Sequence, residues 1–225
     1  MEWLYCGIIG YLMGAVNPSY LLAKRRGVDI RTRGSGNAGA TNAMLLFGKS
    51  VGVFCALFDI AKAYLAVFLA ELLFPEFSYA VPVTSVFCIV GHVFPFYMKF
   101  KGGKGFACLS GIVLCYDRGI FLLMLLGALV LALVSDYICF VPVLASLVFP
   151  ILYGFLEQDL LGAIILSVIA VIMVAKHLEN FRRIYGGTEL RLSYLWKPKA
   201  EEERLRNNLG DPNATAENYM SGRKI

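Results

Sequence analysis

The sequence predicts an all-α integral membrane protein with about seven transmembrane helices, its N-terminus outside the cell and its C-terminus in the cytoplasm. Composition is the first observation behind this prediction: 58% of the 225 residues are hydrophobic, 16% are charged, and the mean hydropathy is +0.67. A soluble domain is about half apolar and about a quarter charged. The second observation is a series of apolar segments whose connections alternate in charge, as in multi-pass membrane proteins.

Seven apolar segments approach the length of about 20 residues that a membrane-spanning helix needs. In chain order they are 3–23, 51–74, 79–98, 105–117, 119–135, 137–156 and 159–176. The first opens with "MEWLYCGIIGYL", which lacks the basic region of a cleaved signal and is expected to remain as a span. The fourth is short and suits a partial or buried helix. Residues 38–47 suit a short re-entrant helix, which needs protein or a water-filled cavity around it.

Charge divides the connections into two sets. The segments 24–50 and 99–104 and the chain from 176 onward hold six, three and ten Lys or Arg residues. The alternate connections contain "PEFS", "YDRG" and "EQD", with one Arg among them. Because cytoplasmic loops collect Lys and Arg, the three basic segments are expected in the cytoplasm. The net charge of +5 is explained in this way and indicates no nucleic-acid partner.

The membrane domain is expected to cover residues 1–195. From 196 the chain turns hydrophilic and lacks an apolar face sufficient for a core, so residues 196–225 are predicted to form a flexible cytosolic tail. The six cysteines lie in apolar stretches without C-x-x-C spacing, which argues against a zinc or redox motif. The two histidines lie far apart with few carboxylates near them, so neither a metal ion nor another cofactor is expected.

Polar residues concentrate in three segments of the predicted cytoplasmic side. The first, "GSGNAGATN", contains G-x-G-x-x-G at residues 34–39. A dinucleotide site would need a strand before it and an acidic residue about 20 positions later in a parallel sheet, whereas here a basic loop precedes it and predicted membrane helices surround it. Its small polar residues could bind a ligand, or could cap the loop's own turns. They are Ser35, Asn37, Thr41 and Asn42.

The second segment, "FKGGKGFA", places Gly102, Gly103 and Gly105 around Lys104. It does not have Walker A spacing. Glycine-rich backbone can present several N–H groups to an oxyanion, and a lysine adds positive charge. A helix beginning near Gly105 would add the partial positive charge of its N-terminus. The alternative is an ordinary tight turn with a basic membrane anchor.

The third segment follows the seventh span. His177, Asn180 and Arg183 recur at i, i+3 and i+6 and share one face if that helix continues. Such a face suits a phosphorylated ligand and proton transfer, or else an interfacial helix end with a snorkelling arginine. Within the spans, Asp59 and Lys62 are functional candidates by default but also suit an ion pair, and His92 suits a structural role.

These segments together resemble the bacterial acyl-phosphate:glycerol-3-phosphate acyltransferases. The resemblance rests on "DIRTRGSGNAGATN" (29–42), "DIAK" (59–62), "GH" with "FKGGKG" (91–105) and "HLENFRRIYGGTE" (177–189). It implies a multi-pass enzyme of the bacterial cell membrane with a cytoplasmic active site, working in phospholipid synthesis. The implied reaction transfers a fatty acyl group from acyl phosphate to the sn-1 hydroxyl of glycerol 3-phosphate. It gives lysophosphatidate and phosphate, and implies a functional link to an acyl-phosphate-forming enzyme.

The resemblance also implies residue roles. Catalysis is expected from four residues: Ser35, Lys104, His177 and Asn180. Substrate binding is expected from ten: Gly36, Asn37, Gly39, Thr41, Asn42, Gly102, Gly103, Gly105, Arg183 and Glu189. Acyl phosphate is already activated, so no covalent enzyme intermediate is required, and no Ser-His-Asp arrangement is evident. The proton of the attacking hydroxyl is expected to pass to His177 or to a substrate phosphate.

One departure from the family pattern affects the expected acceptor site. Family members usually carry Arg three residues after the "GATN" asparagine, and this chain has Leu45 there. In the family that Arg is thought to contact the acceptor phosphate. A paralogue with another acceptor, or with no activity, is therefore a second interpretation. A small anion transporter is a third, although the sequence lacks the inverted repeat that many transporters show.

Overall fold

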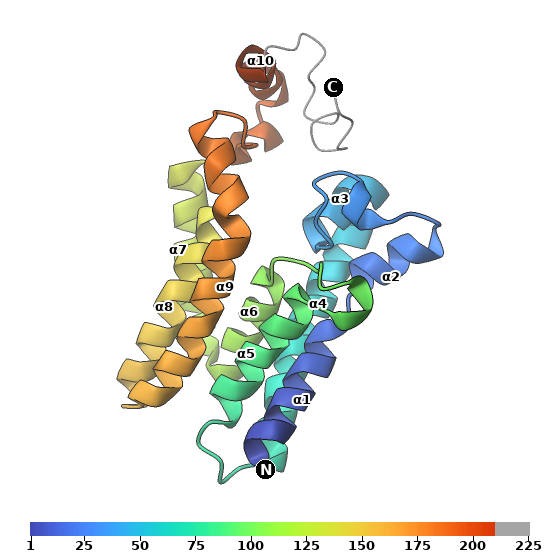
Figure 1. Cartoon of the computed structure of the whole chain (residues 1–225). Coiled ribbons are helices and arrows are strands. Elements are labelled where there is room, and N and C mark those ends of the chain that lie inside the picture. The colour runs from blue at the N-terminus through green and yellow to red at the C-terminus, as the bar shows by residue number, and fades with distance from the viewer. Residues whose placement is uncertain (210–225) are drawn as a thin grey trace.

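The computed structural model describes residues 1–209, and throughout this range it is helical, without a strand (Figure 1). The α-helices are α1 (Glu2–Ala15), α2 (Pro18–Arg25), α3 (Ala40–Phe47), α4 (Lys49–Leu73), α5 (Ala80–Val93), α6 (Phe106–Tyr116), α7 (Arg118–Ser135), α8 (Phe140–Leu156), α9 (Leu160–Tyr185) and α10 (Pro198–Leu209). Three short 3-10 turns lie at Ile30–Thr32, Phe96–Met98 and Leu192–Leu195.

Within residues 1–209, five helical stretches are long and apolar enough to cross a membrane. They are Glu2–Arg25, Lys49–Leu73, Ala80–Met98, Arg118–Ser135 and Leu160–Tyr185. The shorter apolar helices α6 and α8 coincide with the other two predicted segments. The predicted all-α fold is therefore confirmed for the described residues, and the short helix expected at 38–47 is α3.

Two predicted spans differ from the structure in ways that matter for the site. The first span is broken, because α1 ends at Ala15 and α2 starts at Pro18. Asn17 caps the second helix by accepting the N–H of Tyr20 at 2.8 Å, and proline suits the first helical position. The last span, predicted to end at 176, continues as helix to Tyr185. This continuation places the third polar segment on α9.

Small residues let the central helices approach closely. A Cβ atom built on Gly14 of α1 would overlap the backbone of Cys88 of α5, and one on Gly111 of α6 would overlap the backbone of Ile60 of α4. Close backbone approach over small residues is how membrane helices gain van der Waals contact without a hydrophobic driving force. Helices α8 and α9 pack together, and α7 carries no buried residue.

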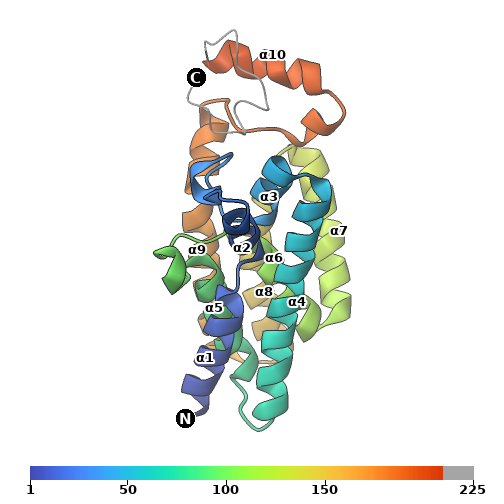
Figure 2. The same cartoon turned by 90° about the vertical axis from the view of Figure 1, so that its right-hand side faces the viewer.

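The predicted polar segments gather toward one end of the molecule. In both views α10 lies at the end opposite the N-terminus, α3 lies in the same half of the molecule, and α2 follows the far end of α1 (Figures 1 and 2). The helix α10 falls within the segment predicted to be a flexible tail, and two of its side chains, Glu201 and Leu205, are buried. Residues 210–225 of that predicted tail lie outside the described residues.

Candidate active site

Asn42 of α3 organises the first polar loop. Its side chain is fully buried, and its Nδ2 lies 2.9 Å from the carbonyl oxygens of Ile30, Arg33 and Asn37. Its Oδ1 accepts the N–H of Ser35 at 3.0 Å. The amide is thus used by the loop backbone, so the structure places Asn42 beneath the loop rather than on its outer surface.

The other predicted residues of this loop lie around Asn42. Ser35, Gly36 and Thr41 are exposed, Asn37 is half-buried, and Gly39 is the N-cap residue of α3. Among residues 1–209, no hydrogen bond joins Ser35 or Thr41 to the other polar segments. The loop is instead attached to the protein at its base.

Arg31 provides that attachment. Its guanidinium pairs with Asp29 at 2.7 Å and donates to the carbonyl oxygen of Met98 at 2.5 Å. The second contact joins the first polar loop to the turn before Gly102, Gly103, Lys104 and Gly105, which we call the glycine loop. Hydrogen bonding from Arg31 lowers the pKa of Asp29 to about 2. The guanidinium of Arg31 is therefore already bound within the protein, by Asp29 and by the Met98 carbonyl.

The glycine loop rests on the end of α5. Gly102 donates its N–H to the carbonyl of Val93 at 3.0 Å, and Gly103 donates to that of His92 at 3.1 Å. A Cβ atom on Gly103 would overlap the His92 ring, and Gly105 has φ +92°. The N–H groups of Gly102 and Gly103, which the sequence predicts to face a ligand, therefore donate hydrogen bonds within the protein. The N-terminus of α6, directly after Gly105, retains its unpaired first-turn N–H groups and partial positive charge.

Lys104 joins the second and third polar segments. Its Nζ donates to Oδ1 of Asn180 on α9. Asn180 in turn donates from Nδ2 to Glu189 at 2.6 Å, and the other Glu189 oxygen accepts from Nε of Arg183 at 2.6 Å. Glu179, on the exposed side, also pairs with Arg183 at 2.8 Å. We call Lys104, Asn180, Arg183 and Glu189 the Lys104 network.

Within residues 1–209 the Lys104 ammonium makes no ion pair of its own, because the two Glu189 oxygens accept from Asn180 and Arg183. Asn180 is buried, and the side chain of Glu189 is only 12% exposed. Burial, and next the nearby Arg183 guanidinium, lower the pKa of Lys104 below its ordinary value, while Glu189 acts in the opposite direction. A bound anion would relieve this destabilisation of the ammonium, because opposite charge favours the charged form.

His177 is buried one turn before Asn180. Its Nδ1 lies 2.8 Å from the carbonyl oxygen of Met173 on the same helix. A carbonyl only accepts hydrogen bonds, so Nδ1 carries the proton and Nε2 is the basic ring nitrogen. The continuation of α9 thus places a neutral imidazole with a defined acceptor beside the Lys104 network.

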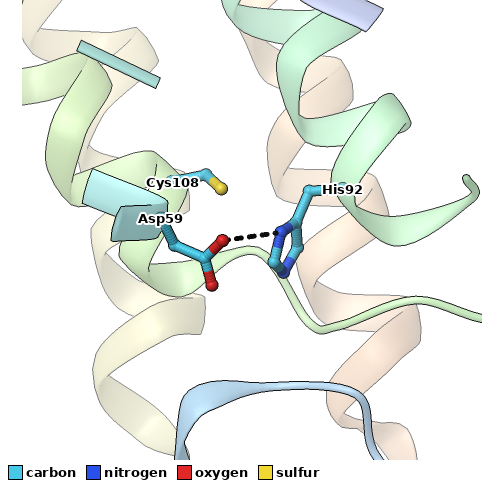
Figure 3. Close-up of side chains that lie close together, drawn as sticks. All are labelled: Asp59, His92 and Cys108. Atoms are coloured by element: carbon cyan, nitrogen blue, oxygen red, sulfur yellow. Dashed lines mark ion pairs between the residues drawn. The ribbon is translucent and has the colours of Figure 1, made fainter. Parts of the chain in front are cut away.

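A second polar cluster lies under the glycine loop (Figure 3). Lys62 Nζ lies 2.6 Å from Asp59 Oδ1 and 3.0 Å from His92 Nδ1, and it also donates to the carbonyl of Val16 at the break between α1 and α2. His92 Nδ1 and Asp59 Oδ1 are 3.6 Å apart. The ion pair expected between Asp59 and Lys62 is therefore present, and His92 has a structural contact with it.

The composition of this cluster does not fit a metal ion. Asp59, His92 and Cys108 place potential ligand atoms within 4.8 Å of one another. However, the Lys62 ammonium already contacts the first two of these groups, so a cation would face a positive charge at contact distance. The cluster is better described as a buried ion pair that joins α1, α4 and α5 below the glycine loop.

Leu45 projects from α3 with 39% of its surface exposed. Its side chain offers no hydrogen bond, and Arg31, a cation in the segment before α3, is held by Asp29. Arg33 and Lys49 are exposed, and the structure gives neither an ion pair within residues 1–209. The first polar segment and the start of α4 thus contain exposed cations, although none stands at position 45.

Comparison with known proteins identifies the family. The sequence profile described as Glycerol-3-phosphate acyltransferase matches residues 4–187. The chain belongs to the glycerol-3-phosphate acyltransferase family. Among its relatives, Glycerol-3-phosphate acyltransferase 2 of Thermotoga maritima is 36% identical over 194 residues, covering 86% of this chain and 98% of the relative. The Geotalea daltonii relative is 38% identical over 188 residues, covering 81% and 94% respectively.

Solved structures of the acyltransferase family share the fold. The glycerol 3-phosphate form of PlsY (YgiH), described as an integral membrane glycerol 3-phosphate acyltransferase, has a TM-score of 0.79 and 29% identity. The alignment covers 87% of this chain and 98% of that one. The lysophosphatidic acid form gives 0.75 and 28%. The predicted family and multi-pass membrane class are confirmed, whereas the predicted site residues stay predictions.

The sequence pattern missed three residues that hold the segment following α9, of which Arg204 contacts the predicted site residue Glu189. They are Asp136, Glu201 and Arg204, which bind the chain around residues 187–193. The only local signal was the opposite charge of Glu201 and Arg204 at i, i+3. Their long-range partners could not be inferred without the fold.

Proposed function

We propose that this chain transfers a fatty acyl group from acyl phosphate to the sn-1 hydroxyl of glycerol 3-phosphate, giving lysophosphatidate and phosphate. The observation that carries the proposal is the Lys104 network, in which the Lys104 ammonium and the Arg183 guanidinium are linked through Asn180 and the largely buried Glu189, just before the N-terminus of α6. Both substrates carry phosphate, and such a site is suited to phosphate. The solved relatives named for glycerol 3-phosphate and for lysophosphatidic acid support the same acceptor and product.

The proposed chemistry is a direct acyl transfer. The acceptor oxygen attacks the acyl carbonyl carbon, the bond from that carbon to the phosphate oxygen breaks, and phosphate leaves. Lys104 and the start of α6 stabilise the charge on the departing phosphate. Asn180 and Arg183 orient the acceptor, which raises the rate by proximity.

The proton of the acceptor hydroxyl has two candidate destinations. One is His177 Nε2, the basic nitrogen left by the Nδ1 contact with Met173. The other is an oxygen of a substrate phosphate. A His177→Gln variant separates them, because loss of a titrating histidine base would remove the rise of kcat with pH that such a base produces, whereas a phosphate acceptor would leave the pH dependence in place.

We further propose seven spans, an external N-terminus and an active site that faces the cytoplasm of a bacterial cell. The basic segments support this orientation, because α10 lies at the end of the molecule opposite the N-terminus and the length of α1 separates α2 from that terminus (Figures 1 and 2). The donor would then come from an acyl-phosphate-forming enzyme in the cytoplasm or at the membrane surface. Cysteine labelling of single positions in intact cells tests the orientation.

A paralogue with a changed acceptor is the second candidate, and Leu45 is the observation that favours it. An exposed apolar side chain stands where the family usually has a cation. Such a paralogue would consume acyl phosphate with an acceptor other than glycerol 3-phosphate.

The test uses purified protein with radiolabelled glycerol 3-phosphate and either palmitoyl phosphate or palmitoyl-CoA. Labelled lysophosphatidate from palmitoyl phosphate alone is the expected result. Lys104→Ala should lose most of this activity, whereas Lys101→Ala, which removes an exposed lysine from the same loop, should keep it. Equal activity of the two variants would exclude the role given to Lys104. Release of phosphate without labelled product would favour the changed acceptor.

A further inference from the structure

The chain returns to the candidate site after α9 ends. The loop 186–191 leads into a 3-10 turn and then into α10, which lies next to the end of α9 (Figure 1). The match to the family ends at residue 187, so α10 lies beyond the matched residues. This helix also makes an apolar contact with the rest of the chain, because the side chain of Leu205 is fully buried.

Arg204 of α10 holds the backbone of this loop. Its Nη1 donates to the carbonyl of Gly187, and its Nη2 donates to the carbonyl of Glu189 at 2.7 Å. Glu201 fixes the guanidinium from the other side, accepting from Nε at 2.8 Å. The side chain of Arg204 is 17% exposed and that of Glu201 4%, so this contact is largely shielded from water.

Two further contacts place α10 against the loop. Asn208 donates from Nδ2 to the same Gly187 carbonyl at 2.8 Å. Asp136, in the turn between α7 and α8, accepts from both the N–H and the hydroxyl of Ser193 at 2.7 Å. The segment between α9 and α10 is therefore held by α10 at Gly187 and by the turn between α7 and α8 at Ser193.

The loop that Arg204 holds carries a residue of the Lys104 network. The backbone carbonyl of Glu189 binds Arg204, while its carboxylate binds Asn180 and Arg183. Asn180 is also the residue that accepts from Lys104. A short path of hydrogen bonds thus connects α10 to Lys104, in which Glu189 contacts Arg204 on one side and Asn180 on the other.

We propose that Arg204 is a positioning residue of the acyltransfer site. By holding the carbonyls of Gly187 and Glu189, it sets the place of the Glu189 carboxylate, which in turn orients Asn180 and Arg183 around Lys104. This inference rests on the proposed function for its kinetic consequence. The contact itself is a property of the fold and can be measured without substrate.

The kinetic test compares three variants of the full-length protein. Arg204→Ala should lower kcat/KM for glycerol 3-phosphate by about tenfold to a hundredfold, the range expected when a remote change misplaces a reacting group. Arg204→Lys, which keeps the charge and one donor direction, should recover part of the loss. Lys199→Ala is the matched control, because it removes an exposed basic residue from the same helix. Unchanged kinetics of Arg204→Ala would overturn the proposal.

A double variant tests whether the effect passes through Glu189. If it does, Arg204→Ala should add little to the loss caused by Glu189→Gln, since residues in one network are not independent. Losses that multiply would mean that Arg204 acts on the site by another route, which would also overturn the proposal.

Hydrogen–deuterium exchange measures the contact without catalysis. The N–H groups of Thr188 and Glu189 both donate to the carbonyl of Arg183, at 2.7 and 3.1 Å. They should exchange faster in Arg204→Ala than in the wild type or Lys199→Ala. Faster exchange in a protein whose wild type forms no lysophosphatidate would refute the proposed function while leaving the contact in place. Unchanged exchange would refute the role of Arg204.

Discussion

Removing the ammonium of Lys62 should destabilise the protein far more than removing both members of its ion pair. Lys62 Nζ and Asp59 Oδ1 are 2.6 Å apart, and the two side chains are 4% and 3% exposed. At an effective dielectric constant of about 20, a pair at this separation attracts by about 6 kcal/mol. Breaking a buried pair from one side costs about 3–5 kcal/mol, because the remaining charge is uncompensated.

Lys62→Met is therefore expected to lower the free energy of unfolding by about 3–5 kcal/mol. In a chain of this size about 1 kcal/mol corresponds to roughly 2–4 °C in Tm, so the decrease should be about 6–20 °C. The double variant Asp59→Asn with Lys62→Met carries no net buried charge and should recover most of that loss. Thermal unfolding in a single detergent, followed by tryptophan fluorescence, measures both.

The comparison between these two variants tests whether charge compensation determines the stability of the cluster. A double variant as unstable as Lys62→Met alone would show that shape and the Val16 contact, not charge compensation, determine the cost. A Lys62→Met protein with wild-type Tm would refute the description of this cluster as a tightly coupled ion pair.

Three further predictions concern the loops of the site. Leu45→Arg should lower KM for glycerol 3-phosphate by about tenfold to a hundredfold, since a hydrogen bond to a charged group contributes about 1.5–3 kcal/mol. An unchanged KM in the acyltransfer assay would show that position 45 is not part of the acceptor site. Asn42→Ala should reduce kcat/KM by at least about tenfold. It should also speed hydrogen exchange of the Ser35 N–H, which loses its acceptor. Exchange at the wild-type rate would contradict the role of Asn42 in holding the loop backbone. Gly103→Ala should reduce activity because the added methyl group overlaps the ring of His92, whereas a wild-type rate in the same assay would mean that the loop can move away without loss.

Helix position and length were largely predictable because they depend on local apolar sequence. The predicted segment 119–135 corresponds to α7 at Arg118–Ser135, and 51–74 to α4 at Lys49–Leu73. The break at Asn17 is also local in origin, since an amide followed by proline suits the start of a helix. It was missed because the apolar segment continues across it.

The candidate site was predictable in residue type but not in arrangement. The glycines around Lys104 indicated a loop for an anion, yet the N–H groups of Gly102 and Gly103 are used by the end of α5. Asn42 was expected on the ligand side and lies beneath its loop. Which polar group faces inward depends on the neighbouring backbone, and a single sequence carries no record of it.

The sequence by itself determined that the chain is helical, belongs in a membrane and carries three phosphate-compatible segments, because each of these follows from local composition and motif. Tertiary structure alone decided that Lys104 meets Asn180, that Lys62 occupies the centre of the buried cluster, and that Arg204 returns to hold the loop of Glu189. These contacts join residues that are distant in sequence. Their geometry follows from how α4, α5, α9 and α10 pack, and packing depends on the whole chain at once.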